Sequence, residues 1–282
     1  MNIEDMMKQY FKEDDIQQKY LLIKTIVKEC PTKTKLFHYA KTCRNMARLY
    51  KNDDEKAIQY HLEELNVYLK MEENNNESLF LKDIYKVMSK LYELYDKVGN
   101  VDEVGYYQVM LSQLKIPYLE KSLASAIWNS EVCALVEHFH RVYKIAMKLV
   151  DEYYKISEYQ KGIEVCDIAI TYSKQLYLNI KQIHYYEMII EARLKKANGY
   201  ELNKEYRNAY HSYEEIDYQM VNDKLQQEQM LIKYNRLIAL ASRLNEEAKV
   251  DYYQQEIKKL MDIKWCISAV NPKGLLQKCS RP

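Results

Sequence analysis

The side chains of this chain that could do metal or acid–base chemistry are six histidines, six cysteines and many carboxylates. His138 and His140 lie two residues apart. On a helix such residues point to different sides, so we do not expect them to share a metal ion. The other histidines have no Cys, Asp or Glu at a recognised ligand spacing: His38, His61, His184 and His211. The sequence therefore predicts no metal site and no cofactor.

The sequence also lacks the glycine-rich motifs of common catalytic and phosphate-binding loops. G-x-x-x-x-G-K-S/T, G-x-G-x-x-G and G-x-S-x-G do not occur in it, and five glycines could hardly build such loops. Carboxylates are abundant, but a chain with this many charges places most of them on solvated faces. We therefore predict that the protein is not an enzyme. A site assembled from distant segments stays open as the alternative.

Composition indicates a cytoplasmic protein without a membrane segment. The cysteines form no C-x-x-C pair, which favours free thiols buried like small hydrophobic side chains in a reducing cytosol. No run approaches the roughly 18 apolar residues that span a bilayer, and the first residues are acidic where a signal peptide would be basic. Because 42 Lys and Arg nearly cancel 41 Asp and Glu, the charge does not favour direct nucleic-acid binding.

Tyrosine is the most over-represented aromatic residue, with 28 copies against four phenylalanines. One interpretation is core packing, in which the ring fills a gap between helices while the hydroxyl reaches the surface. The other is that some tyrosines, such as Tyr154, Tyr200 and Tyr234, face a groove and contact a ligand. Both interpretations stay open at this stage.

The elements that position these side chains are predicted to be helices. Only five Gly and four Pro occur, too few for the tight turns of a sandwich, barrel or doubly wound sheet. The segment Glu158–Ile163 returns 47 residues later as Glu205–Tyr210, each time after a long amphipathic run. Such recurrence indicates a repeat array, which typically presents a concave surface to a peptide or protein.

Apolar periodicity places five helix hairpins along the chain, and the predicted organisation has three parts. Residues 1–33 form N-terminal helices that cap the array, with Asp14 and Asp15 as N-cap candidates. Residues 34–262 form the repeat array, in which Pro117 ends the second hairpin and residues 118–137 form an irregular hairpin. Residues 263–282 form a C-terminal cap or tail that carries Trp265. This apolar segment covers the last hairpin or docks on a second subunit, which would make the protein a homodimer.

Two second helices begin with Tyr-x-x-small, at Tyr159 and Tyr206, and this pattern resembles the tetratricopeptide repeat. The small residue that lets the two helices of that motif approach closely matches Ala57, Gly162, Ala209 and Ala248, whereas Val104 departs from it. The resemblance implies an all-α, right-handed superhelical solenoid of about five to six antiparallel helix hairpins. Within this class the chain is most similar to the peptide-pheromone receptors of Gram-positive bacteria and their phages. Those receptors usually carry an N-terminal helix-turn-helix or helical bundle, and residues 1–33 show no convincing recognition helix.

The resemblance also implies a ligand-binding groove lined by the first helix of each hairpin. Carried over to this sequence, the groove candidates are Asn45, Arg48, Lys86, Lys97, Lys144, Asp151, Tyr154, Lys155, Asn198, Glu201, Tyr234 and Asn235. Ser89, Glu93, Met147, Glu191 and Leu194 share the same faces. An Asn amide can donate and accept hydrogen bonds at once, which suits a peptide backbone. Each of these residues is equally explained as an ordinary solvated helix residue.

Two classes of function follow. The first is a regulatory receptor whose groove binds a peptide or protein segment and whose shape or self-association changes on binding. The second is a constitutive scaffold, adaptor or chaperone-like subunit of a multiprotein complex. The Asn and Tyr residues of the first helices favour the receptor, and the lack of a recognisable output domain favours the scaffold.

Overall fold

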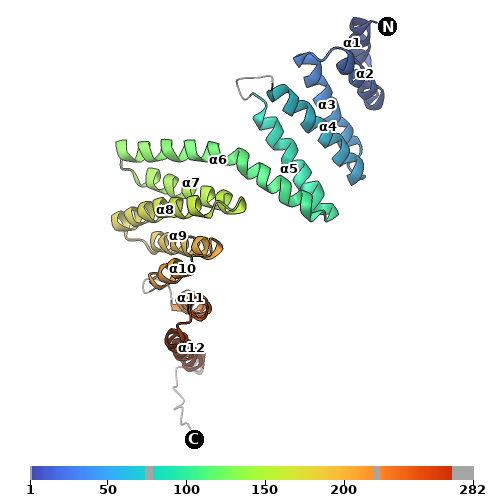
Figure 1. Ribbon diagram of the computed structural model, residues 1–282. Helices are drawn as coiled ribbons and strands as arrows, with labels where there is room; N and C mark the ends of the chain where they lie inside the picture. The colour runs from blue at the N-terminus through green and yellow to red at the C-terminus, as the bar shows by residue number, and fades with distance from the viewer. Residues whose placement is uncertain (1, 74–78, 219–222, 269–282) are drawn as a thin grey trace. The chain divides into compact units, whose positions relative to one another are not determined.

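The computed structural model describes residues 2–73, 79–218 and 223–268, without the side chains of residues 223–227 and 262–268 (Figure 1). All the regular structure in these ranges is helical, as the turn-poor composition predicts. The chain divides into two compact units, unit 1 from Met1 to Lys115 and unit 2 from Ile116 to Pro282.

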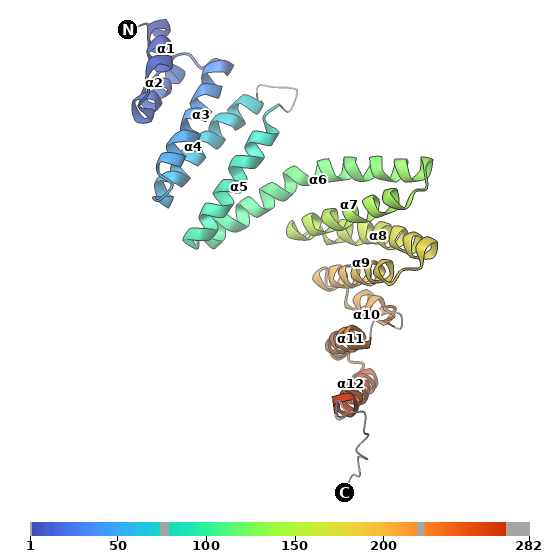
Figure 2. The same ribbon diagram turned by 180° about the vertical axis from the view of Figure 1, so that it is seen from behind.

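Each unit is a stack of antiparallel helix hairpins in which neighbouring helices in sequence pack on one another (Figures 1 and 2). Unit 1 contains α1 (Ile3–Lys12), α2 (Ile16–Glu29), α3 (Lys33–Leu49), α4 (Asp54–Glu73), α5 (Leu81–Val98) and the first part of α6 (Val101–Val132). Unit 2 contains the rest of α6, α7 (Val136–Lys155), α8 (Tyr159–Ile180), α9 (Ile183–Leu202), α10 (Tyr206–Glu214), α11 (Asp223–Arg243) and α12 (Glu247–Ser268). The helical-repeat fold that the sequence predicts is therefore present.

The N-terminal helices are held to the first hairpin by a polar cluster around Glu63. The Asp15 carboxylate accepts the Gln18 N–H and starts α2 where the sequence predicts it. On α4, the Glu63 carboxylate accepts hydrogen bonds from the Tyr20 hydroxyl at 2.6 Å and the Tyr39 hydroxyl at 2.8 Å. Because those tyrosines belong to α2 and α3, one carboxylate joins three helices.

The connection between the two helices of a hairpin has the same geometry four times. A residue with positive φ ends the first helix, and a backbone hydrogen bond then closes across the helix end, as in a Schellman motif. The Glu158 N–H donates to the Tyr153 carbonyl at 3.0 Å, and the Glu205 N–H donates to the Tyr200 carbonyl at 2.9 Å. The positive-φ residues are Gly99, Ser157, Lys204 and Asn245. The repeated Glu-Tyr segment of the sequence is thus the start of a second helix after this turn.

The small residue that follows the turn has the packing role expected of it. Gly162 lies against the Tyr154 ring, and a Cβ added there would approach Cδ1 of that ring to 2.7 Å. Ala57 and Ala209 are buried at the same place in their helices. The assignment of Ala248 is wrong: its side chain is exposed, and Val250 occupies the equivalent place, donating its N–H to the carbonyl that precedes the helix.

The predicted break at Pro117 does not occur. α6 is 32 residues long and contains Pro117 in its interior. The irregular hairpin expected at 118–137 is therefore the second part of α6 and the start of α7. Proline removes one helical hydrogen bond and disfavours helix interiors. Apolar side chains of α6 are buried before and after Pro117, and their burial offsets the cost of the proline. Tyr107 lies in the unit 1 core and Leu123 in the unit 2 core. α7 begins only at Val136.

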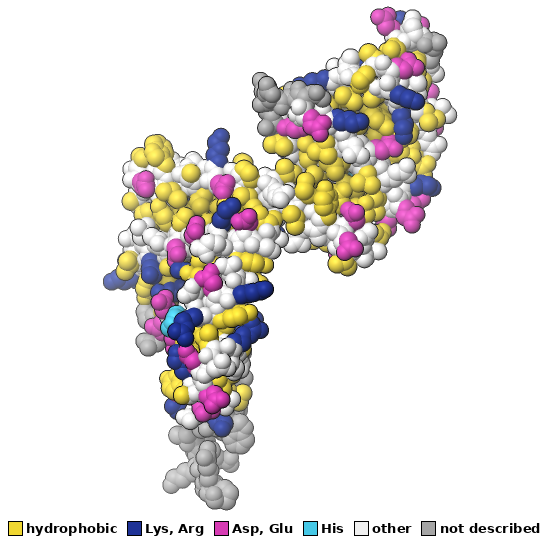
Figure 3. Space-filling view, viewed as in Figure 1, with side chains coloured by type: hydrophobic (Ala, Val, Ile, Leu, Met, Phe, Trp, Pro, Cys, Tyr) yellow, Lys and Arg dark blue, Asp and Glu magenta, His cyan; other side chains and the backbone are white. Residues whose placement is uncertain are grey.

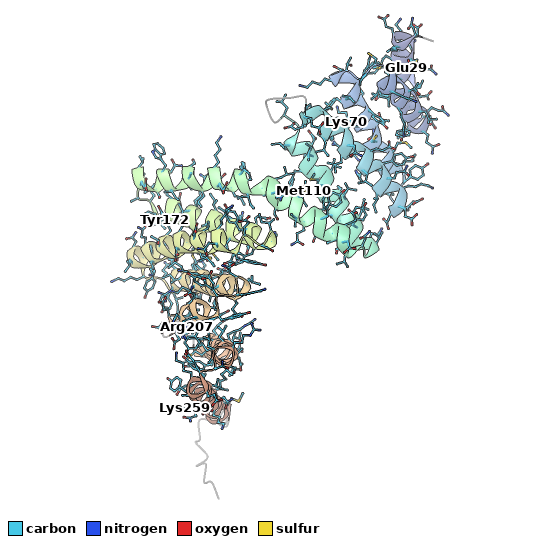
Figure 4. The ribbon with its side chains drawn as sticks, viewed as in Figure 1. Glu29, Lys70, Met110, Tyr172, Arg207 and Lys259 are labelled. Carbon is cyan, nitrogen blue, oxygen red and sulfur yellow. The ribbon has the colours of Figure 1, made fainter. Side chains whose placement is uncertain are left out.

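The second part of α6 packs on α8 within unit 2. The Ser130 hydroxyl donates to the hydroxyl oxygen of Tyr172 at 3.2 Å, and Tyr172 is labelled on α8 in Figure 4. The same ring contacts the Phe139 ring of α7 at a centroid distance of 5.8 Å. Residues 269–282, including most of the predicted C-terminal cap, and the side chain of Trp265 lie outside the described residues.

Candidate ligand-binding grooves

Unit 1 carries a basic groove between α3 and α5, which we call the α3–α5 groove. It encloses about 560 Å³. It is lined by Arg44, Arg48, His61, Glu64, Tyr85, Lys86, Val87, Ser89 and Lys90. Two of the predicted groove residues, Arg48 and Lys86, are therefore brought together here from successive first helices.

Several residues that line the α3–α5 groove pair with one another. Glu64 is fully buried, and its carboxylate accepts the Arg44 Nε–H at 2.6 Å and contacts His61 Nδ1 at 3.0 Å. The Arg44 guanidinium also donates to the Tyr68 hydroxyl oxygen at 3.1 Å and lies 3.6 Å from the Asp83 carboxylate. These partners satisfy Arg44, and Lys90 pairs with Glu93 on its own helix. The charge available to an anionic ligand therefore comes from Arg48 and Lys86, which are both exposed.

Unit 2 carries an acidic and apolar groove between α9 and α11, which we call the α9–α11 groove. It encloses about 370 Å³, within the range of known small-ligand pockets. One face of α9 provides most of it, and the segments after α10 and within α11 close it. The lining residues are His184, Glu187, Met188, Ile190, Glu191, Leu194, Tyr218 and Gln229.

Polar contacts between successive first helices fix the position of α9. The Tyr143 hydroxyl of α7 donates to the Glu191 carboxylate at 2.8 Å, and the ammonium group of Lys195 pairs with the Asp151 carboxylate of α7. At the other end of α9, the Glu201 carboxylate lies 3.7 Å from the Arg236 guanidinium of α11. Polar contacts therefore join α7, α9 and α11, which are the first helices of the three hairpins in unit 2.

The Tyr218 hydroxyl is the least satisfied polar group of the α9–α11 groove. The Tyr218 side chain is 3% exposed, and its hydroxyl oxygen has no hydrogen-bond partner among the described residues. Burial raises the pKa of Tyr218 to about 12, so the hydroxyl keeps its proton at neutral pH. A buried hydroxyl without a partner is costly, and such groups are rare in folded proteins. A ligand in this groove could supply the partner.

Several predicted groove residues are instead engaged within the fold. Lys97 pairs with Asp54 at 2.7 Å, and Lys155 pairs with Glu152 at 3.1 Å on its own helix. Asp151 and Glu201 make the contacts between first helices described above. Lys97, Asp151 and Glu201 join neighbouring helices, and Lys155 is paired within α7, which leaves all four less available to a ligand than the resemblance implies.

The predicted tyrosines also pack inward. The Tyr154 hydroxyl donates to the Lys195 carbonyl at 2.9 Å, and its ring lies against Gly162 and Gly199. Its assignment to an open groove is therefore corrected to a packing role between α7, α8 and α9. The Tyr234 ring stacks on the Tyr253 ring at a centroid distance of 5.5 Å, and Tyr200 is half-buried. For these three residues the core-packing interpretation describes the observed contacts.

The remaining candidates lie on the surface, and their binding role stays a prediction. Asn45, Asn198 and Asn235 are exposed, and none lines either groove. Lys144 lines a third, shallow groove with residues of α6 and α7, including His140, Arg141 and Lys148. The sequence did not single out His184, Glu187, Tyr218 or Gln229 for the α9–α11 groove. The spacing of Glu187 and Glu191 on one face of α9 was the available signal.

The two histidines of α7 contact different groups. His138 Nδ1 lies 2.7 Å from the Cys133 carbonyl oxygen, whereas the His140 ring contacts the Tyr185 ring. Across the described residues, no three His, Cys, Asp or Glu side chains gather in a way that could hold a metal ion. No helix in the described part of the chain combines the length and apolarity needed to cross a bilayer.

Comparison with known proteins shows distant structural likenesses only. No family model matches the sequence, and no curated protein matches it. BtubC (BKLC) from P. vanneervenii aligns over 100% of this chain and 98% of its own, with 11% identity and a TM-score of 0.37. The apo form of RapI aligns over 92% of this chain and 76% of its own, with 12% identity and a TM-score of 0.40. The designed helical repeat protein DHR64 aligns over 93% of this chain and 100% of its own, with 14% identity and a TM-score of 0.24.

Proposed function

We propose that this protein is a non-catalytic binding protein of the tetratricopeptide type, whose first helices bind a peptide or a segment of a partner protein. In this proposal it acts as a regulatory receptor in the cytoplasm. The observation that carries the proposal is the Tyr218 hydroxyl, which is buried in the α9–α11 groove and has no hydrogen-bond partner among the described residues. A ligand that accepts a hydrogen bond from this hydroxyl would remove the cost of leaving it unpaired, so such a group is expected at a binding surface.

The α9–α11 groove has the composition of a peptide site. Met188, Ile190 and Leu194 offer apolar surface, while Glu187, Glu191 and Gln229 offer polar atoms. Small-ligand and peptide sites typically combine an apolar lining with a few placed polar groups. A ligand that joins α9 to α11 would favour one arrangement of the two helices, which is how binding would shift the receptor between states.

The proposal is tested by affinity selection from a random peptide library, followed by calorimetry with the selected peptides. Leu194→Trp fills the groove and should abolish binding of peptides selected there. Leu202→Trp introduces the same side chain at an exposed place on the same helix, outside the groove, and should leave binding unchanged. If the library yields no binder for the unaltered protein, the peptide-binding proposal is wrong.

A constitutive scaffold is the second candidate, and the surface of α6 favours it. Tyr118, Trp128 and Val132 are 73%, 63% and 65% exposed, and Figure 3 shows hydrophobic side chains gathered over this helix. An apolar face of this kind is typical of contact with another protein. A scaffold would retain a whole-protein partner that Trp128→Ser releases, whereas Leu194→Trp would leave that partner bound.

A further inference from the structure

Two carboxylates of the α9–α11 groove lie on one face of α9. Glu187 and Glu191 are four residues apart on α9, so their carboxylates lie on the same face, and like charges at this spacing destabilise a helix. Among the side chains that the structure describes, no Lys or Arg lines this groove. The nearby cations of α9 are used elsewhere: Lys195 pairs with Asp151, and the Arg193 guanidinium donates to the Glu215 carbonyl at 2.6 Å.

The carboxylates keep acceptor capacity although one is already hydrogen-bonded. Glu191 accepts the Tyr143 hydroxyl through Oε2, which holds its side chain in place and leaves Oε1 for another donor. Glu187 lies 3.9 Å from His184 Nδ1, beyond hydrogen-bond distance, and its side chain is 42% exposed. The pair can therefore accept several N–H groups from one cationic head.

The apolar side chains of the groove could pack against the methylene groups of a Lys or Arg side chain. Met188 and Ile190 are 4% and 7% exposed, and Leu194 is partly buried beside them. Lys and Arg side chains bury their methylene groups on apolar surface while the charged head reaches polar partners. Tyr218, buried in the same groove, can donate its hydroxyl proton to a backbone carbonyl of the segment that carries this side chain.

From this arrangement we propose that the α9–α11 groove binds a lysine or arginine side chain of a peptide segment, with its cation on Glu187 and Glu191 and its backbone on Tyr218. The proposal rests on the proposed function and specifies the ligand chemistry of that same groove. The ligand is therefore a basic segment, in contrast to the acidic segment that the α3–α5 groove would attract.

The test uses the full chain labelled with ¹³C at the methionine methyl groups, because Met188 lies in the groove and reports on its occupancy. The Met188 resonance is assigned by its loss in Met188→Leu. The probes are N-acetyl-Leu-Arg-Leu-amide and the same peptide with citrulline in place of arginine. Citrulline keeps the length and most of the hydrogen-bonding groups but carries no charge. The arginine probe should shift the Met188 signal at a concentration about tenfold lower than the citrulline probe does.

Separate variants test the role of the two carboxylates and the role of the Tyr218 hydroxyl. The double substitution Glu187→Gln with Glu191→Gln keeps an acceptor for Tyr143 and should remove the preference for arginine. Glu164→Gln, an exposed carboxylate on α8, is the matched control and should keep it. Tyr218→Phe should weaken both probes about fivefold to tenfold and leave their ratio unchanged.

Equal Met188 shifts with both probes would overturn the charge assignment, and unchanged affinity in Tyr218→Phe would overturn the role of the hydroxyl. A library that yields peptides bound in the α3–α5 groove, with no response of Met188 to either probe, would overturn this inference while the proposed function stands. A library without any binder would instead overturn the proposed function. The two failures are therefore distinguishable.

Discussion

Replacing Gly162 by alanine tests whether close approach of α8 to the Tyr154 ring holds the α7–α8 hairpin together. Gly162 is buried, and an added Cβ would lie 2.7 Å from Cδ1 of Tyr154 and closer still to Cε1. Real Cβ atoms do not approach a ring this closely, so either α8 or the ring must move. Gly199 on α9 faces the same ring, where an added Cβ would lie 2.8 Å from Cζ. Both sides of the ring are therefore occupied.

The expected size of the effect follows from three contributions. Overpacking a well-filled core costs about 1–3 kcal/mol. Displacing the ring breaks the hydrogen bond from its hydroxyl to the Lys195 carbonyl, and a buried hydroxyl left without a partner costs about 1–3 kcal/mol. The higher helix propensity of alanine stabilises α8 by about 1 kcal/mol and offsets part of this cost. Gly162→Ala should therefore lower the free energy of unfolding of unit 2 by about 1–5 kcal/mol, with a midpoint of about 3 kcal/mol.

Gly105 is the matched control, because it also lies inside a helix but is exposed, and an added Cβ would have no neighbour within 4 Å. Gly105→Ala should stabilise unit 1 by about 0.5–1 kcal/mol. Urea unfolding measures both changes. Tryptophan fluorescence follows unit 2, since both tryptophans of the chain, Trp128 and Trp265, belong to it. Circular dichroism follows the whole chain.

A double-mutant cycle identifies the cause. In a Tyr154→Leu background the ring is gone, and Gly162→Ala should cost little or become stabilising. The packing argument is refuted if Gly162→Ala is as stable as the unaltered protein, or if its full cost persists after Tyr154 is shortened.

Three further changes probe the turn, the long helix and the Glu63 cluster. Lys204 has a φ of 62°, where a side chain costs about 1 kcal/mol, so Lys204→Gly should raise Tm by about 2–4 °C in a thermal melt. Pro117→Ala restores a hydrogen-bond donor inside α6 and should stabilise that helix by up to about 3 kcal/mol, seen as slower amide exchange; unchanged exchange would contradict the argument. Burial alone would raise the pKa of Glu63, but hydrogen bonds from Tyr20, Tyr39 and Lys24 lower it overall. Its stabilising contribution is thus complete above the unfolded pKa of about 4.3 and lost as pH falls through the lower folded value, so Glu63→Gln should reduce stability at pH 7 and flatten the acid dependence of unfolding.

The hairpins were predictable because their signals are local. Apolar residues recur at helical spacing, and the turns repeat the same few residue types before Tyr159 and Tyr206. The continuation of α6 was not predictable, because proline argues locally for a helix end. The burial of residues on both sides of Pro117 is a tertiary effect that the local pattern does not contain.

The candidate site was predictable only in part, for a related reason. Arg48 and Lys86 lie on faces that the repeat pattern assigns to a groove, and the structure places both in one. Lys97 and Asp151 share those faces, but their partners lie 43 and 44 residues away in sequence, a separation that no local pattern reports. Tyr218 follows α10 in a stretch without helical period, so nothing in the sequence marks its hydroxyl as buried.

The two grooves show how one repeat geometry provides surfaces of opposite charge. The turns and the small residues fix how first and second helices pack, and they leave the exposed face of each first helix unconstrained. On α3 and α5 that face carries Arg48, Lys86 and Lys90, and on α9 it carries Glu187 and Glu191. A ligand of either sign is attracted to one groove and repelled by the other, so charge alone selects its place. Added salt should therefore weaken binding at either groove and reduce the discrimination between them, and salt-independent binding would show that apolar contacts, not charge, direct the ligand.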